Sequence, residues 1–173
     1  MKAILLLAAI FLVVGLGACA TRPPLATVPS VDLRRYAGTW HEIARYPNWF
    51  QRKCTGPATA EYTPLPDGRI QVVNRCRRAD GSMDSVTGTA TVVPGSNKTK
   101  LKVGFGGPFR GDYWIIGLDQ KNYSWALVGH PSRKFLWILA RDPNLPDRTY
   151  NEIVALAVSK GYDASRIQRT DHP

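Results

Sequence analysis

The 173-residue chain has little of what metal centres, membrane spans and most hydrolases need. It has only three histidines, His41, His130 and His172, and they stand at no spacing known for metal ligands. Its longest apolar run, residues 3–14, is shorter than the about 20 residues that cross a bilayer. It has no nucleophile elbow, and the glycine-rich stretch 104–108 is not followed by a helical pattern. We therefore expect no resident metal, no cofactor and no phosphate-binding loop.

The N-terminal residues have the layout of a secretory signal, with Lys2, the apolar run and then small residues. Leu16-Gly17-Ala18-Cys19 is typical of the lipobox at which bacterial lipoproteins are cut and acylated. Lipidation of Cys19 is therefore expected. Cleavage after Ala20 by ordinary signal peptidase is the alternative, because Ala18-Cys19-Ala20 also fits its small-x-small pattern, and it would remove Cys19.

Three segments follow from this interpretation: a signal peptide over 1–18, a lipidated proline-rich tether over 19–31, and one folded domain over 32–173. The tether shows three prolines between Thr21 and Ser30 and no apolar periodicity, so it is expected to stay outside the fold. At about 3.1 Å per residue, it would hold the domain up to roughly 40 Å from the anchor. No internal repeat and no second domain are recognised.

The chain is strongly basic, with 23 Lys and Arg against 13 Asp and Glu, a formal charge of +10. An exported protein meets no nucleic acid in its normal work, and the basic residues are scattered, so no nucleic-acid partner is expected. Anionic lipid surfaces are the better partners. A basic surface that serves solubility alone is an equally good interpretation.

Cysteine usage points to one disulfide. With Cys19 assigned to the lipid, Cys54 and Cys76 remain as an even pair in an oxidising compartment. A structural disulfide between them is the expected outcome.

From Gly38 onward, short runs rich in Val, Ile, Thr, Tyr and Trp alternate with turn residues, which is typical of β-strands. Short links favour antiparallel neighbours, and one helix is predicted afterwards, with Asp147 as its N-cap and Gly161 as its stop. The fold class predicted is all-β, an eight-stranded antiparallel up-and-down barrel with one C-terminal α-helix, and a two-sheet sandwich is the alternative. The eight predicted strands are 38–46, 58–63, 70–77, 86–93, 99–105, 111–118, 123–129 and 135–140.

Three motifs in order resemble those of the lipocalins. Gly38-Thr39-Trp40 matches the family's Gly-x-Trp signature, and Arg141 matches the third motif. Asp119 to Tyr123 resembles the second motif, although its Thr-Asp-Tyr core is here Leu118-Asp119-Gln120. The stretches 40–45, 107–109 and 136–143 resemble the bacterial lipoprotein lipocalins in particular. Ala20 is not the aspartate that retains such lipoproteins at the inner membrane, so the resemblance implies the periplasmic face of the outer membrane.

The resemblance implies structural roles for the motif residues. Trp40 is expected to plug the closed end of the barrel, with the Arg141 guanidinium over its indole. Gly38 is expected to let the backbone pass close to that plug. These residues should affect folding before they affect ligand affinity.

Strand alternation, set by Trp40 and Arg141, then predicts which side chains of the first and eighth strands face the interior. For the fifth and sixth strands, the inward-facing side chains are those that the resemblance to the lipocalins implies. The lining is mostly apolar or aromatic and suits an acyl chain. Glu42 is the exception, because a carboxylate in such a place needs a partner. A structural hydrogen bond to a tyrosine or arginine is preferred over ligand contact for it. The expected ligand-binding residues are Glu42, Tyr46, Val103, Phe105, Tyr113, Ile115, Phe135 and Trp137, with Ala44, Leu101, Gly117 and Leu139 also inside.

The expected function is therefore a membrane-tethered binder, not an enzyme, that holds fatty acids, lysophospholipids or similar amphiphiles for storage, transport or membrane maintenance. Its other partner is the bacterial outer membrane, and a homodimer is left open. An isomerase-like enzyme on the same barrel is the alternative, and it would need a reactive cysteine or a positioned acid. Haem binding through His130 is a weaker third interpretation.

Overall fold

The computed structural model describes residues 22–172, so the predicted signal peptide and Cys19 lie outside the described residues. Eight strands form a closed antiparallel barrel, because β1 pairs with β8 on one side and with β2 on the other. This closure confirms the predicted barrel and excludes the two-sheet sandwich. A short ninth strand extends the sheet beside β1.

The elements follow one another as a meander, in which each strand from β1 to β7 pairs with the next one in sequence. In chain order they are α1 (Leu33–Tyr36), β1 (Gly38–Arg45), the 3-10 helix η1 (Trp49–Gln51), β2 (Cys54–Pro64), β3 (Ile70–Arg78), β4 (Met83–Val92), β5 (Lys100–Gly104), β6 (Gly111–Leu118), β7 (Trp125–Gly129), β8 (Leu136–Ala140), α2 (Asp147–Ser159), the 3-10 helix η2 (Ala164–Arg166) and β9 (Gln168–Arg169).

The alternating strand directions give the barrel two different ends. At the end where β1 begins, α1 covers the interior, and Tyr36 and Trp40 are buried beneath it. We call this the closed end. The loops 46–53, 79–82, 105–110 and 130–135 gather at the other end. We call that end the mouth. Val86, which lies near the start of β4 and faces inward, is still 46% exposed there.

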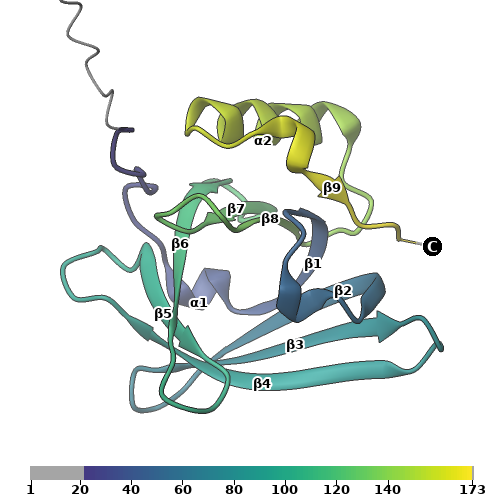
Figure 1. Ribbon diagram of the computed structural model, residues 1–173. Coiled ribbons are helices and arrows are strands. Elements are labelled where there is room, and N and C mark those ends of the chain that lie inside the picture. The colour runs from purple at the N-terminus through teal and green to yellow at the C-terminus, as the bar shows by residue number, and fades with distance from the viewer. Residues whose placement is uncertain (1–21, 173) are drawn as a thin grey trace, which may run out of the picture.

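Helix α2 lies across the outside of the barrel, over β7 and β8 (Figure 1). Its buried residues Ile153 and Ala157 pack with Leu127, Leu136 and Ile138 of the outer sheet face. The core is therefore divided in two, one part inside the barrel and one between sheet and helix. No helix among the described residues is both long enough and apolar enough to cross a membrane.

The start of α2 differs from expectation in one detail. Asp147 is the first helical residue, and the N-cap position is held by Pro146, which gives no side-chain cap. Gly161 follows the helix end with a φ of +86°, a left-handed conformation that suits glycine.

The proline-rich stretch before α1 packs on the barrel, and the expectation of a free tether is corrected for this part. Leu25 and Val31 are buried, and the Val28 amide donates to the Ile115 carbonyl of β6 at 3.0 Å. At its start, the Pro23 carbonyl accepts from the Arg133 guanidinium at 2.7 Å. We call residues 23–31 the strap. The strap begins beside the mouth and runs to α1. In Figure 1 it recedes from the viewer along this path, as its fading colour shows.

Candidate functional site

The closed end is built by the first and third motifs. The guanidinium carbon of Arg141 lies 3.8 Å from the Trp40 ring centroid, the contact that the resemblance to the lipocalins implied. Trp40 is fully buried, and its indole N–H donates to the Tyr36 carbonyl at 2.8 Å. Gly38 has a φ of +91°, and a side chain there would meet Arg141 at 3.5 Å. These residues hold α1 over the barrel.

The second motif closes the turn between β6 and β7. The Asp119 carboxylate accepts from the Ser124 hydroxyl at 2.6 Å and from the Lys121 amide at 3.1 Å. The Tyr123 hydroxyl accepts from the Asp32 amide at 3.0 Å, and Arg35 lies over the Tyr123 ring. The second motif thus ties the entrance of α1 to the barrel.

Two bulges change which side chains face inward. The register of β1 against β8 shifts between Glu42 and Ala44, so Ala44 and Tyr46 pack outside, in the core beneath α2. The prediction that these two line the interior was wrong. The Tyr46 hydroxyl instead donates to the Asp163 carbonyl at 2.8 Å.

The second bulge lies in β6, between Ile115 and Gly117. A side chain at Gly117 would meet Leu156 of α2 at 2.7 Å, so Gly117 faces the helix and not the interior, as had been expected. The extra residue shifts the alternation by one position, so that in β6 the next interior side chain is Leu118.

The other predicted lining residues lie inside the barrel. Val103, Ile115, Leu101 and Leu139 belong to the buried interior core. Tyr113 and Trp137 pack against this core yet keep part of their surface exposed. Because both side chains lie inside a closed wall, that exposure means that side chains do not completely fill the interior.

Aromatic rings dominate the wall near the mouth. Phe135 and Trp137 stack with 9° between their planes, and the Phe50 ring lies 5.8 Å from Phe135 and 6.2 Å from Trp137. Across the barrel, Phe105 covers inward-facing Gly88, where a Cβ would lie 2.6 Å from its ring. Phe50 belongs to η1. It was not among the residues predicted to line the site.

Three tyrosines form a polar cluster deep in the interior, separate from the set around Glu42. The Tyr113 hydroxyl lies 2.7 Å from that of Tyr36 and 2.9 Å from that of Tyr62. Burial raises the pKa of Tyr62 to about 12, although the hydrogen bond with Tyr113 opposes the shift. Burial also raises the pKa of Tyr36 and of Tyr113 well above the ordinary value. The three hydroxyls are therefore neutral donors and acceptors that satisfy one another.

Glu42 is buried and fully partnered. Its carboxylate pairs with the Arg45 guanidinium and accepts from the Gln51 amide at 2.7 Å and the Thr170 hydroxyl at 2.8 Å. Gln51 in turn accepts from the Trp137 indole N–H at 3.0 Å. The arginine partner agrees with the structural role preferred for Glu42, although Arg45 lies toward the mouth rather than at the closed end.

The predicted disulfide is confirmed, and it lies at the mouth. Cys54 is the first residue of β2 and Cys76 lies near the end of β3, with their Cα atoms 5.5 Å apart.

His130, the candidate haem ligand, has its Nδ1 2.8 Å from the Ser132 hydroxyl. Burial lowers the pKa of His130, while Asp112 opposes that shift.

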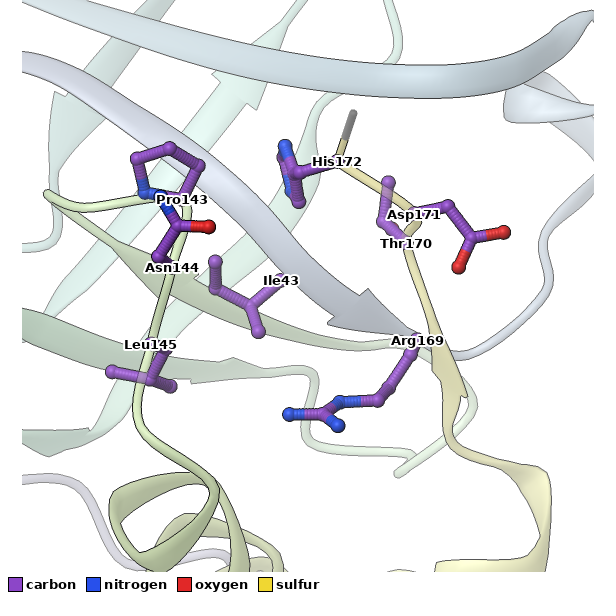
Figure 2. Close-up of a pocket in the computed structure, with 8 residues that line it drawn as sticks. All are labelled: Ile43, Pro143, Asn144, Leu145, Arg169, Thr170, Asp171 and His172. Atoms are coloured by element: carbon purple, nitrogen blue, oxygen red, sulfur yellow. The ribbon is translucent and has the colours of Figure 1, made fainter.

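One surface depression lies outside the barrel, between the β8–α2 loop and the C-terminal segment. Figure 2 shows Asn144 and His172 on its two sides, with Ile43 between them. Burial lowers the pKa of His41, whose ring lies 6.0 Å from that of His172. Within residues 22–172, no three His, Cys, Asp or Glu side chains gather in a way that could hold a metal ion.

Comparison with known proteins now adds to this geometry. A family model described as a lipocalin-like domain matches residues 31–172. The chain belongs to the lipocalin family. It is 38% identical to Outer membrane lipoprotein Blc of Escherichia coli (strain K12) over 169 residues, 95% of this chain and 93% of that protein.

Other relatives place this lipocalin in a wide family. Temperature-induced lipocalin-1 of Arabidopsis thaliana is 38% identical over 154 residues, 84% of this chain and 82% of that protein. The solved structure of insecticyanin from the tobacco hornworm Manduca sexta has a TM-score of 0.71 at 24% identity, covering 88% of this chain and 87% of that one. This last likeness shows the fold alone.

Proposed function

We propose that this lipocalin binds fatty acids, lysophospholipids or similar amphiphiles inside its barrel, and that a lipid on Cys19 holds it at the periplasmic face of the outer membrane. Storage, transport or membrane maintenance would be the use of such binding. The observation that carries the proposal is the aromatic interior, which side chains do not completely fill at Tyr113 and Trp137. The printed name of the Blc relative, an outer membrane lipoprotein, supports the location.

An acyl chain would enter between the stacked ring pair Phe135 and Trp137 on one wall and Phe105 on the other. Each methylene that leaves water would contribute about 0.8 kcal/mol. The charged head group would stay at the mouth, where Arg110 and Lys134 are exposed and could neutralise a phosphate or carboxylate. The three tyrosine hydroxyls toward the closed end already bond one another, so they do not offer a site for a charged group.

The described residues offer no free group for the enzyme alternative at the two places where it was expected. Its reactive thiol would have to be Cys54 or Cys76, and these are joined. Its positioned acid would be Glu42, whose carboxylate is already engaged by three side chains.

A matched pair of variants tests the binding. Ala60 of β2 packs against the interior core and is half-buried, whereas its neighbour Thr59 alternates to the outer face. Ala60→Phe should fill the interior and abolish saturable binding of oleate and lysophosphatidylethanolamine, followed by tryptophan fluorescence on delipidated protein. Thr59→Phe should bind as the wild type does. Absence of saturable binding by the wild type would refute the proposal.

A further inference from the structure

Large apolar side chains that remain exposed are concentrated at one end of the barrel. Seven such residues are exposed in the described part of the chain, and only Val158 lies away from the mouth, on α2. Scattered single residues of this kind are ordinary, but a cluster marks an interaction surface. The six at the mouth are Trp49, Phe50, Met83, Val86, Phe105 and Phe109.

Two of these six side chains are too exposed to form part of the interior wall. Phe109 is 86% exposed and Trp49 is 70% exposed, so both project from their loops into solvent. Trp49 contacts Phe50, whose other face reaches Phe135 and Trp137. The interior wall therefore continues outward, without a break, into an apolar rim. Aromatic rings on such a rim are typical of the interface between water and a bilayer.

Basic side chains surround the same rim. None of the exposed ones forms an ion pair within the described residues. Of the acidic neighbours, Asp84 and Asp112 are neutralised by Arg78 and Lys102, each at 2.8 Å, so Asp80 alone stands against the five unpaired basic side chains. An apolar rim with surplus positive charge fits an anionic lipid surface. The exposed basic residues near the mouth are Arg52, Lys53, Arg77, Arg110 and Lys134.

The strap brings the chain's N-terminal side to this end of the barrel. Pro23 is held by Arg133, which stands in the β7–β8 loop at the mouth, and the strap runs from there to the closed end. Cys19 is four residues before Pro23, and a chain of that length reaches at most about 14 Å. An anchor on Cys19, which is part of the proposed function, would therefore lie beside the mouth and not beside α1.

We propose that the mouth docks directly onto an anionic phospholipid bilayer, with Trp49, Phe109 and Met83 in the head-group region. The barrel interior then opens toward the membrane, and an acyl chain passes between bilayer and barrel without crossing bulk water. A second copy of the chain fits this face less well, because two mouths brought together would oppose their surplus positive charges.

The test uses the full lipoprotein reconstituted in vesicles of phosphatidylethanolamine and phosphatidylglycerol. Phe109→Cys and, as the matched control, Lys121→Cys at the closed end each carry an environment-sensitive fluorophore on the new thiol. At position 109 we expect a blue shift on the vesicles, quenching by brominated lipid acyl chains and protection from iodide. At position 121 we expect none of these. Vesicles of phosphatidylcholine alone should give a smaller blue shift at position 109.

Three outcomes would overturn docking: equal responses at both positions, no response at position 109, or a blue shift at position 109 that grows with protein concentration without vesicles, which indicates a second copy. Two further measurements separate this proposal from the proposed function. Mass spectrometry of the N-terminal peptide shows whether Cys19 carries acyl chains. The Ala60→Phe variant, which should not bind ligand, should still give the position 109 response if docking is independent of binding.

Discussion

The guanidinium of Arg141 covers the indole of Trp40 at the closed end and at the same time donates to backbone carbonyls on both sides of it. The acceptors are the carbonyl oxygens of Thr39 at 2.7 Å, Ala37 at 2.8 Å and Arg35 at 2.9 Å. One side chain thus satisfies carbonyls of the α1 turn and of the first strand. Burial lowers the pKa of Arg141, while its electrostatic interaction with Tyr36 opposes that shift.

Replacing Arg141 should weaken the fold. Arg141→Gln loses the contact with Trp40 and leaves the carbonyls of α1 without donors, so the free energy of unfolding should fall by about 2 to 4 kcal/mol. Urea denaturation followed by fluorescence measures this. Arg166→Gln is the control, because Arg166 lies over the Tyr46 ring at 4.5 Å but is exposed. Equal losses in the two variants would contradict a special role for Arg141.

The buried tyrosines give a prediction for alkaline pH. The pKa of Tyr62 in the folded protein is about 12, whereas tyrosine in an unfolded chain has a pKa of about 10. Because the folded pKa is the higher one, the stability it contributes is complete below about pH 10 and is lost as pH rises toward 12. Tyrosinate absorbance should therefore appear for Tyr36, Tyr62 and Tyr113 only as the protein unfolds, which circular dichroism follows in parallel. Ionisation of every tyrosine near pH 10 in a folded protein would refute this.

The strands could be predicted because each depends on local pattern, whereas the contact between Trp40 and Arg141 was implied by the resemblance to the lipocalins. The alternation around Trp137 and Leu139 is regular, and β8 faces as expected. A bulge adds one residue without changing composition, so the alternation failed at Tyr46. Its signal was the polar pair His41-Glu42 followed by the apolar pair Ile43-Ala44, which together break the alternation of the strand.

The strap could not be predicted from its composition. Prolines removed the periodicity that marks a helix or strand, and its backbone finds hydrogen bonds only with distant groups, such as the Ile115 carbonyl. Leu25, Val28 and Val31, spaced three apart, were the available signal, and each packs against the folded domain. The Glu42 site was equally hidden, since Thr170 reaches it from 128 residues away.

Loss of the disulfide should destabilise the mouth end of β2 and β3. Cys54 and Cys76 close a loop across 22 positions, so reduction should lower the free energy of unfolding by about 2 to 4 kcal/mol. Urea denaturation with and without dithiothreitol gives the difference. The Cys54→Ala, Cys76→Ala double variant should match the reduced protein and respond to dithiothreitol no further. An unchanged denaturation midpoint on reduction would contradict the prediction.

Glu42 joins the barrel to the C-terminal segment, and its removal should release that segment. Glu42→Gln keeps the shape of the side chain but leaves Arg45 without its counter-charge, so the free energy of unfolding should fall by about 1 to 3 kcal/mol. Thr170→Val removes only the hydroxyl that bonds the carboxylate at 2.8 Å, and it should cost about 1 kcal/mol.

Amide hydrogen exchange distinguishes these two effects. In Glu42→Gln, protection should decrease both at Thr170, whose amide donates to the Ile43 carbonyl at 2.9 Å, and around Gln51, which loses its bond to the carboxylate. In Thr170→Val, the decrease should be confined to residues 168–172, because Arg45 and Gln51 keep Glu42 in place. Faster amide exchange confined to the C-terminal segment in both variants would show that Glu42 does not hold η1 in place at the mouth.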